Sequence, residues 1–144
     1  MKFKDLLLKQ KTIIVAEIGN NHEGNFDVAT KLIDKASACG VDAVKFQTFI
    51  PKYFISNDYN GKAIKKLKKF KLSFEQFEKL SMIAKKKNLL FFSTPLDIQS
   101  ATFLNKIQDV FKIASGDNDF LDLIKNINNY LNNLLNFIIK IRKN

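Results

Sequence analysis

Four short apolar runs alternate with segments of helical periodicity, and this alternation strongly limits how the chain can fold. The apolar runs are residues 13–18, 43–46, 89–92 and 110–114. Each has the length and composition of a buried β-strand. The segments between them repeat apolar residues three and four positions apart, as amphipathic helices do. The order β-α-β-α-β-α-β predicts an α/β fold with a parallel sheet and right-handed crossovers.

Three helices are predicted between these strands, over residues 26–39, 73–87 and 98–107. Gly40 follows the first helix as a C-cap glycine would, Ser73 and Gln76 have capping-box spacing, and Asp97 can cap the third helix. The predicted buried faces consist of Val28, Ala29, Leu32, Ile33 and Ala36, and of Phe74, Phe77, Leu80, Met82, Ile83 and Ala84. Residues 51–72 do not fit a short connection and are predicted to form a long functional or mobile loop.

Length and composition narrow the class of protein. A chain of 144 residues with 46% apolar content suits one domain with a hydrophobic core, whereas a complete (β/α)8 barrel needs roughly 250 residues. Cys39 is the only cysteine, which excludes an internal disulfide and favours a reduced, cytoplasmic setting. It is expected to pack in its helix as a small apolar residue. No signal peptide or membrane-spanning segment is predicted.

The net charge of +10 raises the question of a nucleic-acid partner. The densest cluster of charge consists of Lys62, Lys65, Lys66, Lys68, Lys69 and Lys71. No aromatic-basic nucleic-acid motif accompanies it, so a solvated helix or loop face is expected and a nucleic-acid partner is not. A basic protein also suits anionic, phosphorylated substrates.

Polar residues stand at or near the carboxyl ends of all four predicted strands. Lys45 and Gln47 share one face of the second strand, and Glu17 lies near the end of the first. The third strand ends in Ser93 and Thr94, and the fourth contains Lys112 and runs into Ser115-Gly116-Asp117. Barrel enzymes keep their active sites at this end of the strands. A packing ion pair between Lys45 and Glu17, and ordinary turns at the other positions, are the structural alternatives.

Two lysines with small hydroxyl groups and a glycine have the composition of an anion site. Lysine supplies a point charge to phosphate, and hydroxyl and backbone N–H groups complete the cage. Glu17 is the natural acid or base candidate because it is the only carboxylate of the first strand. His22 is the only histidine, so it either orders its loop or contributes to the site, and it cannot form a two-histidine metal site.

Four motifs occur in order along the chain: AEIGNNHEG at 16–24, DAVKFQT at 42–48, FSTPLD at 92–97 and KIASGD at 112–117. Together they resemble the N-terminal part of the sialic acid synthase family, which includes the N-acetylneuraminate, legionaminic acid and pseudaminic acid synthases. The resemblance covers about residues 11–125. It implies a partial TIM (β/α)8 barrel of about the first four βα units, truncated before the barrel closes.

The resemblance also implies a metal-dependent condensation of phosphoenolpyruvate with an N-acetylated amino sugar. By motif match, Lys45, Thr94, Lys112 and Ser115 bind phosphoenolpyruvate, and Gln47 supports that pocket. Asn20 and His22 shape the sugar end. Glu17 and Asp117 are the implied catalytic residues, with Asp117 where many members have glutamate. The Mn or Mg ligands of the family are two histidines of the second half of the barrel, which are absent here.

The expected division is residues 1–125 as the half-barrel and residues 126–144 as an atypical tail rich in Asn, Lys and Ile, consistent with a shifted reading frame. Such a chain is expected to be inactive alone. The alternatives are a non-catalytic phosphoenolpyruvate-binding module and half of a split enzyme, completed by a complementary half-barrel chain or a homodimer. A Schiff-base aldolase using Lys45 is a further alternative.

Overall fold

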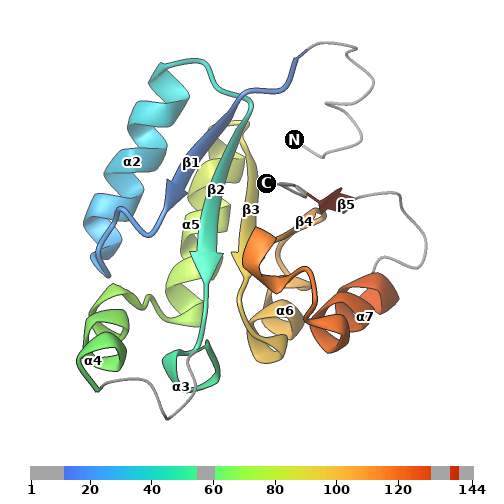
Figure 1. Cartoon of the computed structure of the whole chain (residues 1–144). Coiled ribbons are helices and arrows are strands. Elements are labelled where there is room, and N and C mark those ends of the chain that lie inside the picture. The colour runs from blue at the N-terminus through green and yellow to red at the C-terminus, as the bar shows by residue number, and fades with distance from the viewer. Residues whose placement is uncertain (1–11, 55–60, 131–136, 140–144) are drawn as a thin grey trace.

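The computed structural model describes residues 12–54, 61–130 and 137–139 (Figure 1). Its strands are β1 (Val15–Gly19), β2 (Ala43–Thr48), β3 (Leu90–Pro95), β4 (Phe111–Ile113) and β5 (Phe137–Ile139). Its helices are α2 (Phe26–Ala38), α3 (Pro51–Phe54), α4 (Gly61–Phe70), α5 (Phe74–Lys86), α6 (Ile98–Leu104) and α7 (Leu121–Tyr130), with a 3-10 turn, η1, at Ser115–Asp117. The predicted alternation of strands and helices is confirmed.

The strands form two parallel sheets, one of order β1-β2-β3 and one that pairs β4 with β5. The prediction of parallel pairing is confirmed, but the fourth strand does not join the ladder of the first three. The buried side chain of Gln108 takes that place, because its Oε1 accepts from Ser93 N at 2.7 Å and its Nε2 donates to Ser93 O at 3.1 Å and Val110 O at 2.8 Å. An amide side chain therefore connects β3 to the start of β4.

The first sheet is apolar on both faces, as parallel sheets are. Val44, Phe46 and Phe91 face α2 and α5 and belong to the larger hydrophobic cluster, and Figure 1 shows these helices along one side of β1–β3. A second cluster on the opposite face consists of Ala43, Leu90, Phe92 and Val110, with Ile13 packed against it. Side chains alternate along a strand, so Lys45 and Gln47 lie on this second face.

The predicted helix ends are confirmed by hydrogen bonds. Ser73 and Gln76 form the reciprocal capping box of α5, at 3.2 Å and 2.8 Å. Asp97 caps α6 through Ser100 N at 2.7 Å, and its other oxygen also accepts from Ile50 N at 2.7 Å, so it ties the end of β2 to the start of α6. Gly40 has φ +72 directly after the C-cap of α2, as its predicted role requires.

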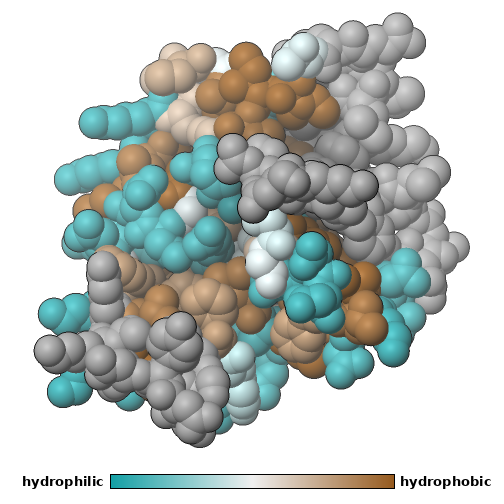
Figure 2. All heavy atoms as spheres, in the orientation of Figure 1, coloured by the Kyte–Doolittle hydropathy of each residue, from teal (hydrophilic) through white to brown (hydrophobic). Residues whose placement is uncertain are grey.

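Several residues predicted to be buried are exposed. Val28 is 38% exposed and Met82 is 55% exposed, because the buried stripes of α2 and α5 are narrower than the predicted faces. Cys39 is exposed because it caps the C-terminal end of α2, beyond the part that packs on the sheet. In β1, Val15 is 39% exposed, because within the described chain this strand has only β2 as a neighbour. Figure 2 shows a hydrophobic area over the region where β1 begins.

Residues 51–72 were predicted to be a loop, and this is wrong for their described part, which forms α3 and α4. The end of α4 packs closely against the loop after β1: a Cβ atom at Gly24 would lie 1.8 Å from the carbonyl oxygen of Lys69. Lys65, Lys68, Lys69 and Lys71 are exposed, as predicted for a solvated face, and the side chains of Lys62 and Lys66 lie outside the described set.

Helix α7 and strand β5 lie partly or wholly within the segment that was expected to be an atypical tail. Helix α7 is amphipathic and buries Leu123 and Ile127 completely in the larger cluster. The boundary between residues 125 and 126 stays a prediction. Among the described residues, no helix has the length and hydropathy needed to cross a membrane.

Candidate active site

The carboxyl ends of β1, β2 and β3 lie side by side and bring the polar residues of three motifs together. The register places Glu17 opposite Lys45, and Gln47 opposite Thr94. Lys45, Gln47 and Thr94 share the face of the second cluster, whereas Ser93 lies on the helix side, where its hydroxyl contacts that of Thr48 at 2.7 Å. The candidate site therefore lies on the face of the sheet opposite α2 and α5.

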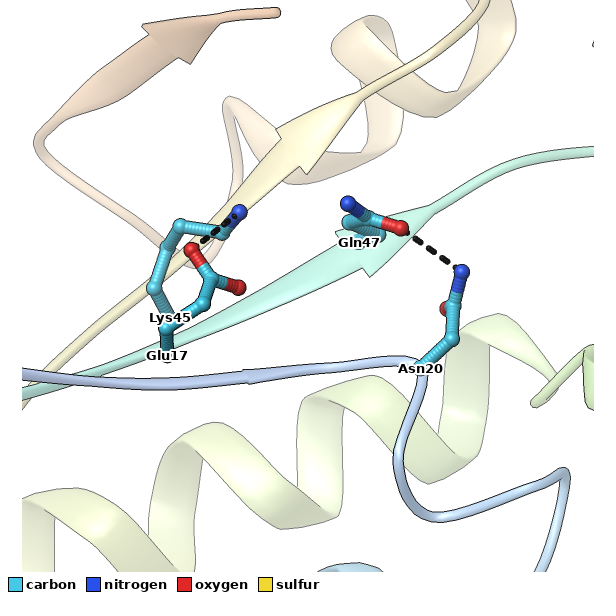
Figure 3. Close-up of polar contacts among 4 residues, drawn as sticks. All are labelled: Glu17, Asn20, Lys45 and Gln47. Atoms are coloured by element: carbon cyan, nitrogen blue, oxygen red, sulfur yellow. Dashed lines mark hydrogen bonds and ion pairs between the residues drawn. The ribbon is translucent and has the colours of Figure 1, made fainter.

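Lys45 and Glu17 form an ion pair, with Lys45 Nζ 2.7 Å from Glu17 Oε2 (Figure 3). The lysine side chain is only 4% exposed, whereas the glutamate side chain is 57% exposed. The structural alternative, an ion pair that only supports packing, is thus met in part. The pair exists, but only its lysine is buried. A buried ammonium needs an anionic partner, and here one solvated carboxylate supplies it.

A bulge in β1 directly follows Glu17. The register shifts between Glu17 and Gly19, so that Glu17 pairs with Lys45 and Gly19 with Phe46, and Ile18 is the extra residue. Gly19 has φ +54, and a Cβ atom there would lie 3.2 Å from Glu17 Oε1. Glycine fits this position for two reasons: it adopts the left-handed backbone without strain, and without a Cβ atom it leaves space for the carboxylate that lies over it.

Asn20 and Gln47 form the second polar pair of the site. Asn20 Nδ2 donates to Gln47 Oε1 at 2.6 Å, as Figure 3 shows. This bond holds the loop after β1 to the end of β2, 27 positions along the chain. Asn20 Oδ1 is buried and has no hydrogen-bond partner. Its carbonyl oxygen is therefore available as an acceptor for a ligand.

His22 is fully buried and is held by its own loop. Its Nδ1 accepts from Gly24 N at 3.0 Å, which leaves the proton of the neutral ring on Nε2. Nε2 is buried without a partner. The ring lies 6.0 Å from that of Phe46, so it packs at the helix side of β2, away from the face that bears Lys45. The structure thus does not place His22 directly beside the lysine.

The free energy of unfolding is expected to fall by about 2 kcal/mol between pH 7 and pH 5 because of His22. Burial lowers the pKa of His22 from 6.5 to about 4. The unfolded chain therefore takes up a proton below pH 6.5, while the folded protein does not until the pH nears 4. Stability from this residue is complete above pH 6.5 and is lost as the pH falls. Denaturant unfolding across this range, in the parent and in His22→Gln, measures the effect.

The difference in unfolding free energy between the two proteins isolates His22, because other titrating groups contribute to both. The difference should shrink by about 2 kcal/mol as the pH drops. A difference that stays constant would contradict the neutral, buried state of the imidazole.

The fourth motif contributes Lys112, Ser115 and Asp117. Lys112 alternates with Phe111 and Ile113, which face the larger cluster, so it shares the opposite face with Val110. Ser115 is exposed in η1. Asp117 is half-buried and its Oδ2 has no hydrogen-bond partner. Desolvation, and then the charge of Asp119, raise the pKa of Asp117, while Lys112 opposes the rise. A carboxyl group with a raised pKa keeps its proton to a higher pH than an exposed aspartate does.

Four buried side-chain atoms in the described part of the chain have no hydrogen-bond partner: Asn20 Oδ1, His22 Nε2, Thr94 Oγ1 and Asp117 Oδ2. All four belong to residues that the sequence motifs single out. An unpartnered buried polar atom costs about 1–3 kcal/mol, so such atoms usually have a partner of some kind. Asn20 and Thr94 lie on either side of Gln47, whereas His22 lies on the helix side of β2.

Sequence reasoning missed two residues that build this site. Gln108 positions β4 relative to β3, and Asp97, predicted only as a helix cap, also binds the backbone after β2. A polar residue two positions before an apolar run is the only signal for Gln108, and it is weak.

The resemblance implies a divalent metal, but the described residues do not fit one. Among residues 12–54, 61–130 and 137–139, no three His, Cys, Asp or Glu side chains are grouped so that they could hold a metal ion. His22 has already used Nδ1 as an acceptor for Gly24 N. We therefore derive no chemical step through a metal.

Comparison with known proteins agrees with this geometry. Residues 32–136 match the NeuB family. The chain is 37% identical over 131 residues to N,N'-diacetyllegionaminic acid synthase of Campylobacter jejuni, an alignment that covers 82% of this chain and 39% of that protein. It is 30% identical over 125 residues to N-acetylneuraminate-9-phosphate synthase of Mus musculus. This alignment covers 76% of this chain and 34% of that protein.

A solved N-acetylneuraminic acid synthetase of Leptospira borgpetersenii, in complex with citrate, has the same fold with a TM-score of 0.76 at 30% identity, over 83% of this chain and 42% of that one. Fold and sequence thus define the chain as an α/β protein related to these synthases. It belongs to the NeuB family, and its relatives are sialic, legionaminic and pseudaminic acid synthases. The chain spans well under half of the length of these curated relatives.

Proposed function

We propose that this chain supplies the phosphoenolpyruvate-binding part of a NeuB-type condensation site. The observation that carries the proposal is the pair of unpartnered buried atoms Asn20 Oδ1 and Thr94 Oγ1, at the carboxyl ends of β1 and β3 on either side of the strand that bears the buried Lys45. Lys45 and Lys112 supply positive charge, while Thr94 and Ser115 supply hydroxyl donors to the phosphate or carboxylate group.

In the proposed reaction, the electron pair of the C2–C3 double bond of phosphoenolpyruvate forms a C–C bond from C3 to the aldehyde carbon of an N-acylated amino sugar, while the C=O π bond opens and the aldehyde oxygen takes up a proton. Water adds to the electron-poor C2 and loses a proton. The C2–O bond to phosphate then breaks, inorganic phosphate leaves, and the C2 hydroxyl loses its proton to give a 2-keto acid. Asp117 is the proposed donor of the first proton, because its pKa is raised. Glu17, Asn20 and Gln47 orient the sugar, and His22 fixes the loop that bears Asn20.

The proposed architecture is that of the first four βα units of a (β/α)8 barrel, with the site at the carboxyl ends of its strands. The groups that complete the pocket, including any metal ligands, then come from outside these 144 residues. They belong either to further sequence of the same protein or to a complementary chain. On this proposal the described part binds phosphoenolpyruvate but does not turn it over alone.

Thr94→Val is expected to weaken phosphoenolpyruvate binding about tenfold and to leave the protein as stable as before or more stable. The hydroxyl of Thr94 is buried without a partner, so valine removes an unsatisfied group at almost constant volume. A donor to a bound anion is worth on the order of one tenfold step in affinity. Isothermal titration calorimetry with phosphoenolpyruvate and denaturant unfolding measure the two effects.

Thr48→Val is the matched control. Thr48 is equally buried on the adjacent strand, but its hydroxyl is bonded to Ser93 at 2.7 Å on the helix side. This variant should lose about 1–2 kcal/mol of stability and keep its affinity. Equal affinity in the parent and in Thr94→Val, or no binding by either, would refute the proposed function.

A further inference from the structure

We propose that Glu17 competes with the anionic ligand for Lys45. In the free protein the Glu17 carboxylate contacts the Lys45 ammonium group, and it must move away when the ligand enters. This inference rests on the proposed function. The ion pair of 2.7 Å is its first observation. An anionic oxygen that binds to this ammonium group comes to lie next to the Glu17 carboxylate unless that carboxylate moves.

The two members of the pair are held very differently. Lys45 extends from the central strand of the first sheet and is 4% exposed, so it stays in place. Glu17 comes from the edge strand β1 and is 57% exposed, so its carboxylate can turn into water and be solvated there at little cost. When the ligand replaces the carboxylate at Lys45, the glutamate side chain therefore moves and the lysine stays in place as a fixed anion site.

The backbone of β1 also favours exchange. Glu17 pairs with Lys45 at the end of the regular register of β1 with β2, directly before the bulge at Ile18, and Gly19 leaves the space that the Glu17 carboxylate occupies, 3.2 Å from where a Cβ atom would be. The carboxylate thus extends from the last regularly paired residue of an edge strand. The remainder of the pocket can stay in place when the side chain moves.

Simultaneous binding of both anions is unfavourable. One ammonium group cannot neutralise a carboxylate and a multiply charged phosphoenolpyruvate that lie against it, and like charges at contact repel strongly in a partly buried site. The affinity for phosphoenolpyruvate is thus reduced by the strength of the Glu17–Lys45 pair. Displacement also frees the Glu17 carboxylate at the mouth of the site, where it can meet the second substrate only after the anion is bound.

Glu17→Gln is expected to bind phosphoenolpyruvate about tenfold more tightly than the parent, because a half-exposed ion pair is worth on the order of that factor. Its free form should have a lower melting temperature, since the buried ammonium loses its partner, and saturating ligand should raise this temperature more than in the parent. Calorimetry and thermal unfolding of the full chain, at fixed pH and ionic strength, measure both quantities.

Asp34→Asn is the matched control. Asp34 Oδ1 lies 2.8 Å from Lys87 Nζ, in a pair at the other end of the sheet from the site, and its side chain is 50% exposed. The variant makes the same change in net charge, and its affinity should stay within about twofold of the parent. Glu17→Asp keeps the charge but shortens the reach to Lys45, so it should also bind more tightly; it serves as the test if Glu17→Gln does not fold.

The outcomes separate this inference from the proposed function. Unchanged or weaker binding by Glu17→Gln and Glu17→Asp, with measurable binding by the parent, would overturn the competition and leave the proposed function standing. An equal gain in Asp34→Asn would assign the effect to net charge and also overturn it. Absence of binding in the parent and in both Glu17 variants would overturn the proposed function itself.

Discussion

Lys45→Met is expected to weaken phosphoenolpyruvate binding by about 100-fold, because it removes the buried charge of the proposed anion site. Methionine has a similar length and flexibility, so it fills the space of the lysine stem between β1 and β3. Glu17 remains hydrated after the change, since its side chain is 57% exposed. The folded protein should therefore be at least as stable as the parent. Calorimetry measures the affinity, and denaturant unfolding measures the stability.

Lys87→Met is the control for this change. It also removes a lysine from an ion pair of 2.8 Å, but that lysine is 35% exposed and lies at the end of α5, before β3 begins. Binding should change less than about twofold. A folded Lys45→Met protein with the affinity of the parent would exclude Lys45 from the anion site.

Gly24→Ala is expected to have the largest effect on the fold, a loss of about 3–5 kcal/mol in the free energy of unfolding. The new Cβ atom would lie 1.8 Å from the carbonyl oxygen of Lys69 and 2.9 Å from its carbonyl carbon. Both are backbone atoms, so no side-chain rotation relieves the overlap. Either α4 moves away or the loop with Asn20 and His22 does. Denaturant unfolding reports the loss, and limited proteolysis in α4 reports its release.

Gly40→Ala separates the clash from the strain of the left-handed backbone. Gly40 has φ +72, close to the φ +78 of Gly24, but a Cβ atom there would meet nothing within 4 Å. This variant should lose only about 1 kcal/mol. A similar loss in both proteins would mean that α4 does not pack against the loop as described.

The parts of the fold that depend on local sequence could be predicted. Apolar runs marked the strands, and the capping box of Ser73 and Gln76 marked the start of α5, because these signals act over a few residues. Exposure could not be predicted as well. Met82 and Val28 lie beside a buried stripe, and only the width of the contact with the sheet decides whether such residues are covered.

Long-range contacts of the site lay beyond sequence reasoning. The motifs indicated which residues gather at the strand ends, but the bond between Asn20 and Gln47 depends on the register of β1 and β2. The packing of helix α4 against Gly24 was not predicted, because a lysine-rich sequence is as typical of a solvated loop as of a helix. The predicted roles of the site residues await the binding experiments.

The side chain of Gln108 is an adjustable connection between β3 and β4. Backbone ladders fix the spacing between β1, β2 and β3, whereas the hydrogen bonds between β3 and the start of β4 run through the side-chain amide of Gln108. Thr94 belongs to β3 and Lys112 to β4. If these residues bind an anion as proposed, a substitution at Gln108 changes the distance between them, and with it the size of the anion that fits, without replacing any residue proposed to contact it.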